Sequence, residues 1–167
     1  MNNKEDNIRP DKDTLVKTES DQRYLLLQAS WHYWGEFYSG VPLSKTWKVY
    51  SDGYYTYESV SRATLEPRDN IYIYEGTLDE NSFRTLCDVF GYSEWPKAHR
   101  DACDGEAWQM ILFDSAGNII NTTGKIGYIY GMTVLENIGD LLRDKCRGQH
   151  LLYKDEEDQT RINELFG

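Results

Sequence analysis

Five residues that could perform chemistry lie close together in one short segment of the sequence. They are His99, Asp101, Cys103, Asp104 and Glu106. A cysteine nucleophile needs a base such as histidine within hydrogen-bond reach. Neighbouring carboxylates can hold a divalent cation or act as general acid and base. One hypothesis is therefore a small cytosolic enzyme with its catalytic site in the loop 99–106.

The same segment lacks the spacing of a metal or cofactor site. A zinc ion on His99 and Cys103 would need two more ligands, and the sequence has no C-x-x-C or H-x-x-x-H pair to supply them. The stretch D-A-C-D-G-E departs from the register of a calcium-binding loop, and G-K-I-G-Y-I-Y-G at 124–131 departs from phosphate-binding loops. We therefore expect no metal and no cofactor, and we interpret the acidic segment as a solvated turn.

Aromatic side chains are the second candidate for function. They make up 14% of the chain, and 13 of them are tyrosines. Successive residues of a strand point to opposite sheet faces, so these rings cannot all enter one core. Exposed aromatic clusters mark binding sites. We expect at least four residues of the following set on a sheet face that no helix covers: Trp31, Tyr33, Tyr50, Tyr55, Tyr57, Tyr72 and Tyr74.

A hairpin is the clearest local signal among the elements that would position these rings. Asp52-Gly53 is a preferred pair for a two-residue type I′ turn, and both flanks are rich in β-branched and aromatic residues. The predicted strands are 46–51 and 54–60. Such a turn pairs Tyr50 with Tyr55 on one face and leaves Trp47 and Val49 on the other.

The remaining pattern predicts further strands and two helices. Further strands are expected at 24–34, 71–74, 108–113 and 119–123. Asp79 suits the N-cap of a first helix that ends near Gly91. Thr133 and Glu136 form a capping-box pattern at the start of a second helix. Cys87 and Cys146 fall on the apolar faces of these helices, so we expect them in the core.

These elements predict a single α+β domain of order β-β-β-β-α-β-β-α. We expect a mostly antiparallel sheet of about five to six strands with two helices on one face. The predicted domain is 22–150, preceded by a flexible polar tail at 1–21. It is followed by an acidic segment at 151–167, for which a last helix is an option. The Asp52-Gly53 hairpin, the Gly76-to-Phe83 strand-to-helix step and the Asp104-Gly105-to-Trp108 strand resemble those of small uncharacterised bacterial α+β proteins. The resemblance implies no activity.

Charge and cysteine content limit the compartment and the class of partner. The net charge is −10, and half of it lies in 1–21 and 151–167. Nucleic-acid binding needs clustered lysine and arginine, so we expect no direct contact with nucleic acid. The start of the chain lacks an apolar stretch and no run is long enough to span a membrane, so we expect a reducing cytoplasm.

The function that we favour from the sequence is a non-enzymatic protein-binding module. The partner would be a protein with a basic surface. A narrower version is an inhibitor from a phage or mobile element, resembling anti-CRISPR proteins, that acts on a nucleic-acid-binding complex of the host. The enzyme hypothesis above is one alternative, and a structural homo-oligomeric protein is another.

Overall fold

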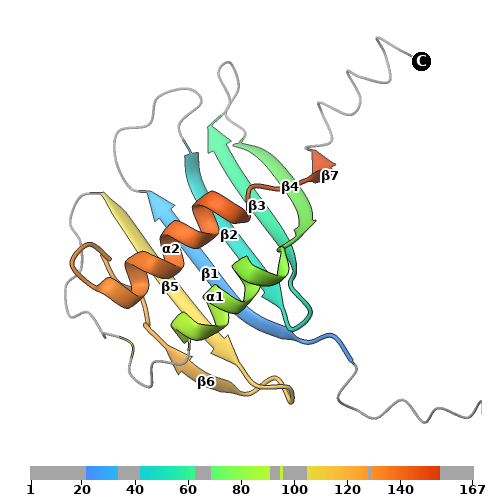
Figure 1. Ribbon diagram of the computed structural model, residues 1–167. Coiled ribbons are helices and arrows are strands. Elements are labelled where there is room, and N and C mark those ends of the chain that lie inside the picture. The colour runs from blue at the N-terminus through green and yellow to red at the C-terminus, as the bar shows by residue number, and fades with distance from the viewer. Residues whose placement is uncertain are drawn as a thin grey trace, which may run out of the picture.

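A seven-stranded antiparallel sheet forms the frame of the protein. The computed structural model describes residues 22–33, 42–62, 69–90, 95, 105–127 and 129–154. Within these residues, two helices lie together on one face of the sheet, whose strand order is β6-β5-β1-β2-β3-β4-β7 (Figure 1). The elements are β1 (Leu25–Tyr33), β2 (Pro42–Tyr50), β3 (Tyr54–Arg62), β4 (Asp69–Thr77), α1 (Glu80–Phe90), β5 (Glu106–Phe113), β6 (Ile119–Thr122), α2 (Thr133–Lys145) and β7 (His150–Lys154).

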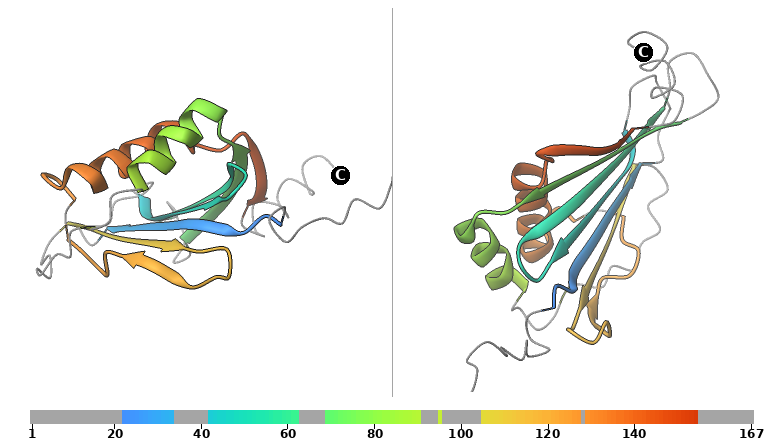
Figure 2. Two further views of the ribbon diagram at one scale, coloured as in Figure 1. Left: turned by 60° about the horizontal axis from the view of Figure 1, so that its bottom comes forward. Right: turned by 90° about the vertical axis from the view of Figure 1, so that its right-hand side faces the viewer.

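The predicted fold class is confirmed, with more strands than expected. The chain is a single α+β domain with both helices on the same side of the sheet (Figure 2). The additional strand is β7, which begins at His150 and pairs with β4. Residues 151–154, which the sequence assigned to an acidic and optionally helical segment, are therefore part of the sheet. The predicted tail at 1–21 and the residues 155–167 lie outside the described part of the chain.

The hairpin between β2 and β3 forms at the predicted residues but with a different turn. Gly53 has a φ of 83°, and its N–H donates to the carbonyl of Tyr50 at 3.0 Å. A type I′ turn would also need a positive φ at Asp52, and no described residue other than glycine has one. The loop therefore spans three residues, 51–53, and ends on the left-handed glycine.

This longer loop shifts the predicted register by one residue. Val49 lies opposite Tyr55 and Trp47 lies opposite Tyr57, where the sequence pattern had placed Tyr50 opposite Tyr55. Because side chains alternate along a strand, a one-residue slip moves every side chain to the other face. The predicted faces of this hairpin were therefore wrong, and Tyr55 lies on the same face as Val49.

We expect Gly53→Ala to lower the free energy of unfolding by about 1–2 kcal/mol, the cost of a left-handed residue with a side chain. The added Cβ would meet Leu78 O and Phe83 Cγ at 3.6 Å, which is ordinary contact, so the effect is one of backbone conformation. Urea denaturation measures it. Gly53→Asn is the control, since asparagine tolerates this conformation better. Equal losses in the two variants would contradict the explanation.

The core lies between the helices and one face of the sheet. Helix α1 contributes Leu86 and Phe90, and α2 contributes Leu135, Ile138 and Leu142. The Asp79 cap is present, because its Oδ1 accepts from the Ser82 N–H at 2.9 Å. The capping box at Thr133 was wrong, since α2 has Met132 at its N-cap and no side-chain cap. From the sheet, the same buried cluster includes Leu27, Ala29, Trp47, Val49, Tyr55, Trp108, Met110 and Leu112.

Candidate binding surface

Five of the seven predicted aromatic residues lie together on the sheet face that carries the helices. We call them the aromatic strip: Trp31, Tyr33, Tyr57, Tyr72 and Tyr74. Trp31 is two residues from the buried Ala29, and Tyr57 is two residues from the buried Tyr55, which places both on the helix side. All five are half-buried. They come from β1, β3 and β4.

The other two predicted residues do not belong to this surface. Tyr55 is only 1% exposed, and its hydroxyl accepts from the Gly148 N–H at 3.2 Å. Burial raises the pKa of this phenol. Tyr50 alternates with the buried Val49 and therefore points to the opposite face, where its ring lies 5.5 Å from that of Tyr54. Tyr55 is thus a core residue, and Tyr50 belongs to another surface.

The expected face was also wrong. The sequence pattern placed Ile71 and Ile73 under the helices and the tyrosines on the uncovered face. In the structure Tyr72 and Tyr74 take the helix side, and the two isoleucines are half-buried on the other side.

The cross-strand register joins the strip to two lysines. Trp31 lies opposite Lys45, Lys45 opposite Ser59, Ser59 opposite Tyr72, and Tyr72 opposite Lys154. Directly opposed residues of an antiparallel pair share a face. One row of side chains therefore crosses five strands. Lys45 Nζ lies 5.4 Å from the Trp31 ring centroid and Lys154 Nζ lies 5.8 Å from that of Tyr72, so a cation accompanies each end of the row.

Three residues of the strip, Tyr57, Tyr74 and Tyr72, belong to a stack of rings that begins in the core, while Trp31 and Tyr33 stack on each other with centroids 6.2 Å apart. Ring centroids are 5.8 Å apart for Trp108 and Trp47 and 5.3 Å for Trp47 and Tyr57. The stack continues to Tyr74 at 6.1 Å and from there to Tyr72 at 6.5 Å. Interplanar angles are 21° or less at each step. Such offset stacks stabilise ring orientation beyond simple burial, so these three half-buried tyrosines are held in fixed orientations.

A polar cluster lies at the Trp31 end of the strip. Trp31 Nε1 donates to Glu106 Oε2 at 2.6 Å, and the second oxygen of Glu106 is buried without a hydrogen-bond partner. The Arg143 guanidinium lies 5.3 Å from the Trp108 ring centroid and forms an ion pair with Asp140 at 2.6 Å. Burial, and then repulsion from Arg143, lower the pKa of Lys45, while Glu106 opposes this shift. Glu106 thus anchors an aromatic ring of the strip.

Of the five residues of the predicted catalytic loop, the structure describes only Glu106. His99, Asp101, Cys103 and Asp104 lie outside the described residues, so the enzyme hypothesis stays a prediction. Of the two described cysteines, Cys146 is buried and its pKa is raised to about 12 by that burial. Burial also raises the pKa of Cys87. Neither thiol is activated as a nucleophile.

Comparison with known proteins gives no guide to function, so the functional argument rests on the geometry of the structure. No family model, no curated protein and no solved structure matches the chain. Within the described ranges, no three histidine, cysteine, aspartate or glutamate residues are grouped as metal ligands would be. The described helices include none with the length and apolar character needed to cross a membrane.

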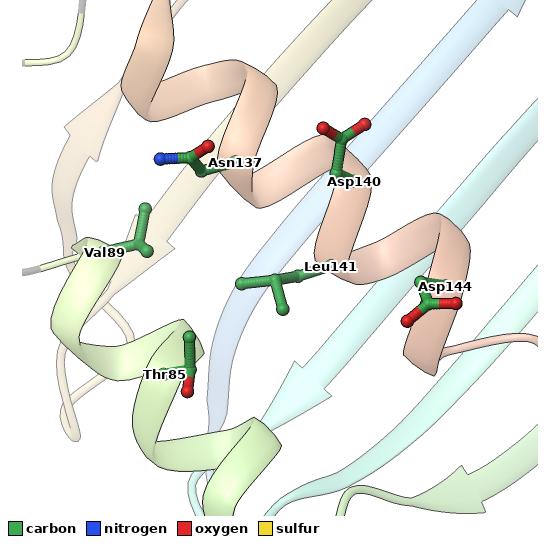
Figure 3. Close-up of a pocket in the computed structure, with 6 residues that line it drawn as sticks. All are labelled: Thr85, Val89, Asn137, Asp140, Leu141 and Asp144. Carbon is green, nitrogen blue, oxygen red and sulfur yellow. The ribbon is translucent and has the colours of Figure 1, made fainter.

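A shallow groove between the two helices is the second surface feature. Its volume is about 470 Å³, and Figure 3 shows Leu141 directed between the helices toward α1. Its two carboxylates already have partners, because Asp140 pairs with Arg143 and Asp144 pairs with Lys145 at 3.2 Å. Both carboxylates that line the groove are therefore already engaged in ion pairs, and the aromatic strip remains the better candidate for a binding site. The lining residues are Thr85, Val89, Asn137, Asp140, Leu141 and Asp144.

Proposed function

We propose that the protein is a non-enzymatic protein-binding module that contacts its partner through the aromatic strip. The observation that carries the proposal is the continuous stack from Trp108 in the core to Tyr72 in the strip. Tyrosine and tryptophan combine a large contact area with few rotatable bonds, and they are enriched among residues that dominate binding energy. Rings already fixed by stacking lose little additional freedom when a partner binds.

The dimensions of the strip suit the centre of an ordinary protein interface. It extends from β1 to β4, which are three strand spacings apart, or about 15 Å. The side chains offer apolar ring faces together with hydroxyl groups, the combination found in good contact surfaces. The half-buried Tyr33 and Tyr72 lie at opposite ends of the strip, so contact with both would require a partner that covers the whole row.

A basic surface on the partner is the chemistry that the overall charge favours. The chain carries a net charge of −10, which attracts a basic protein and raises its association rate. The narrower proposal is an inhibitor from a mobile element, similar to anti-CRISPR proteins, that occupies a basic nucleic-acid-binding channel. Because Lys45 and Lys154 border the strip, the acidic residues would attract the basic partner from the surface surrounding the strip, and the aromatic rings would make the central contact. Such binding weakens as salt screens the charges.

We expect the double variant Tyr33→Ala with Tyr72→Ala to bind the partner at least about tenfold more weakly, because loss of a dominant contact costs about 2 kcal/mol or more. The partner is first recovered by capture on the immobilised full chain from the cells that make it. Isothermal titration calorimetry of the purified pair then measures the affinity.

A matched pair of tyrosines on the opposite face provides the control. Tyr50→Ala with Tyr54→Ala removes two rings that also contact each other but lie outside the strip. This variant should bind like the native chain. Unchanged affinity in the strip variant would contradict the proposal. So would a thermal melt showing that the strip variant has unfolded, since the tyrosines would then serve the core.

A further inference from the structure

The aromatic strip has positive charge at both ends, although the chain as a whole has a net charge of −10. Lys45 and Lys154 lie beside the rings of Trp31 and Tyr72, with Nζ at 5.4 Å and 5.8 Å from the ring centroids. The segment 145–154 contains two lysines, one arginine and no aspartate or glutamate. A segment that covers the strip closely would therefore be favoured by carboxylates placed at these two ends.

Lys45 is a half-buried cation without a paired carboxylate. It belongs to none of the ion pairs formed within the described part of the chain. Burial, and then repulsion from Arg143, lower its pKa, and Glu106 opposes this shift without forming an ion pair with it. A partly desolvated ammonium group is stabilised when a carboxylate comes close to it. Lys45 is therefore a position at which an added carboxylate would be held.

The sequence that follows β7 has the composition that this surface favours. Residues 155–167 lie outside the described part of the chain, and they contain five carboxylates and one arginine. The first four residues form an acidic run, and three large apolar residues follow it: Asp155, Glu156, Glu157 and Asp158, then Ile162, Leu165 and Phe166. The segment thus combines negative charge next to β7 with apolar side chains farther along, in the order in which the strip would meet them.

We propose that residues 155–167 fold back across the aromatic strip, with the acidic run on its two lysines and the apolar residues on its rings. The register sets the starting point, because Lys154 lies opposite Tyr72 at one end of the row. Lys45 is on β2, three strand spacings from β7 in the sheet order, or about 14 Å. Four extended residues also cover about 14 Å, so Asp158 is the residue that reaches Lys45. The residues after it then lie over the β1 end of the strip.

This contact makes the segment a competitor of the protein partner, a consequence that rests on the proposed function. A basic partner would pair with the acidic run and draw it away from the two lysines, so the rings would be covered in the free protein and uncovered in the complex. The contact itself needs no partner. Tests on the full chain alone therefore separate its failure from a failure of the proposed function.

Carbodiimide coupling of the native full chain tests the contact, because this reagent joins a lysine to a carboxylate that lies directly beside it. We expect peptide mass spectrometry to find Lys45 joined to a residue of 155–158 in chains that keep the monomer mass of 19.5 kDa. Lys48 is the internal control, since it is exposed and points to the opposite face of the same strand. Absence of the Lys45 product, or its formation only between two chains, would overturn the proposal.

Neutralising the acidic run removes the contact without shortening the chain. The variant combines Asp155→Asn, Glu156→Gln, Glu157→Gln and Asp158→Asn. Acetylation of Lys45 by acetic anhydride should become about threefold faster in this variant, while the rate at Lys48 stays the same. The matched control neutralises four carboxylates of the N-terminal segment and changes the net charge equally: Glu5, Asp6, Asp11 and Asp13. Lys45 should react in that control as in the native chain. Equal acceleration in both variants would show a general effect of charge and contradict the proposal.

Discussion

Replacing Trp47 with alanine should lower the free energy of unfolding by about 3–5 kcal/mol, the usual range for truncating a large buried aromatic residue. Trp47 is 2% exposed and lies between the rings of Trp108 and Tyr57. Its Nε1 donates to the carbonyl of Cys146 at 3.1 Å, just after the end of α2. Alanine would leave a cavity under the helix and a carbonyl without this donor.

Chemical denaturation measures this loss, and Trp47→Phe separates its two causes. Phenylalanine keeps most of the buried ring but cannot donate to Cys146, so its cost should be nearer to the 1–3 kcal/mol of an unmet buried hydrogen bond. A loss below about 1 kcal/mol in Trp47→Ala would mean that the stack contributes little to stability. Because Tyr57 belongs to the aromatic strip, the alanine variant should also loosen this ring and weaken partner binding, although no residue of the strip is replaced.

Gly76→Ala should destabilise the protein by about 3 kcal/mol, at the upper end of the range for overpacking. A Cβ at this position would overlap the Tyr55 ring, lying 2.5 Å from its Cζ and 2.9 Å from its Cε1. Tyr55 cannot easily move away, because it is buried and its hydroxyl accepts from the Gly148 N–H. The glycine is required here by close approach of a side chain to the backbone of β4.

A double-mutant cycle tests this explanation. Tyr55→Leu alone should destabilise the protein, since it removes ring contacts and the acceptor for Gly148. In the Gly76→Ala background the same change should cost much less, because leucine vacates the space that the new Cβ needs. Chemical denaturation of the four proteins gives the coupling free energy. Strictly additive losses would show that the overlap with Tyr55 is not the cause.

Local chemistry in the sequence was sufficient to predict both helices and the first six strands of the fold. Asp52-Gly53 located the hairpin and Asp79 located the start of α1. The predicted core positions Leu86, Phe90, Leu135, Ile138, Leu142 and Cys146 are buried, but Cys87 is only half-buried and lies outside the core cluster. These signals are local, acting over a few residues. The seventh strand was missed because Leu151 and Leu152 show no alternation, and their pairing depends on β4, which is distant in sequence.

The aromatic strip was harder to predict because it depends on the register of the β2–β3 hairpin and on which sheet face the helices cover. The loop at 51–53 is one residue longer than a type I′ turn, and this moved Tyr55 and Tyr57 to the helix side. Periodicity separates two faces of a strand, but it does not tell which face the helices cover. The pairing of Trp31 with Lys45 could have been found only from the correct hairpin and sheet order.

The position of β1 in the sheet has a consequence for how the chain folds. Strands β1 to β4 are neighbours in sequence, and each pairs with the next. β1 must also pair with β5, where Trp31 meets Trp108, and β4 must pair with β7. These two contacts close long loops, whose entropic cost comes before any stabilising contact. A meander of four strands can therefore form early, while both flanks of the sheet are completed only when the second half of the chain docks.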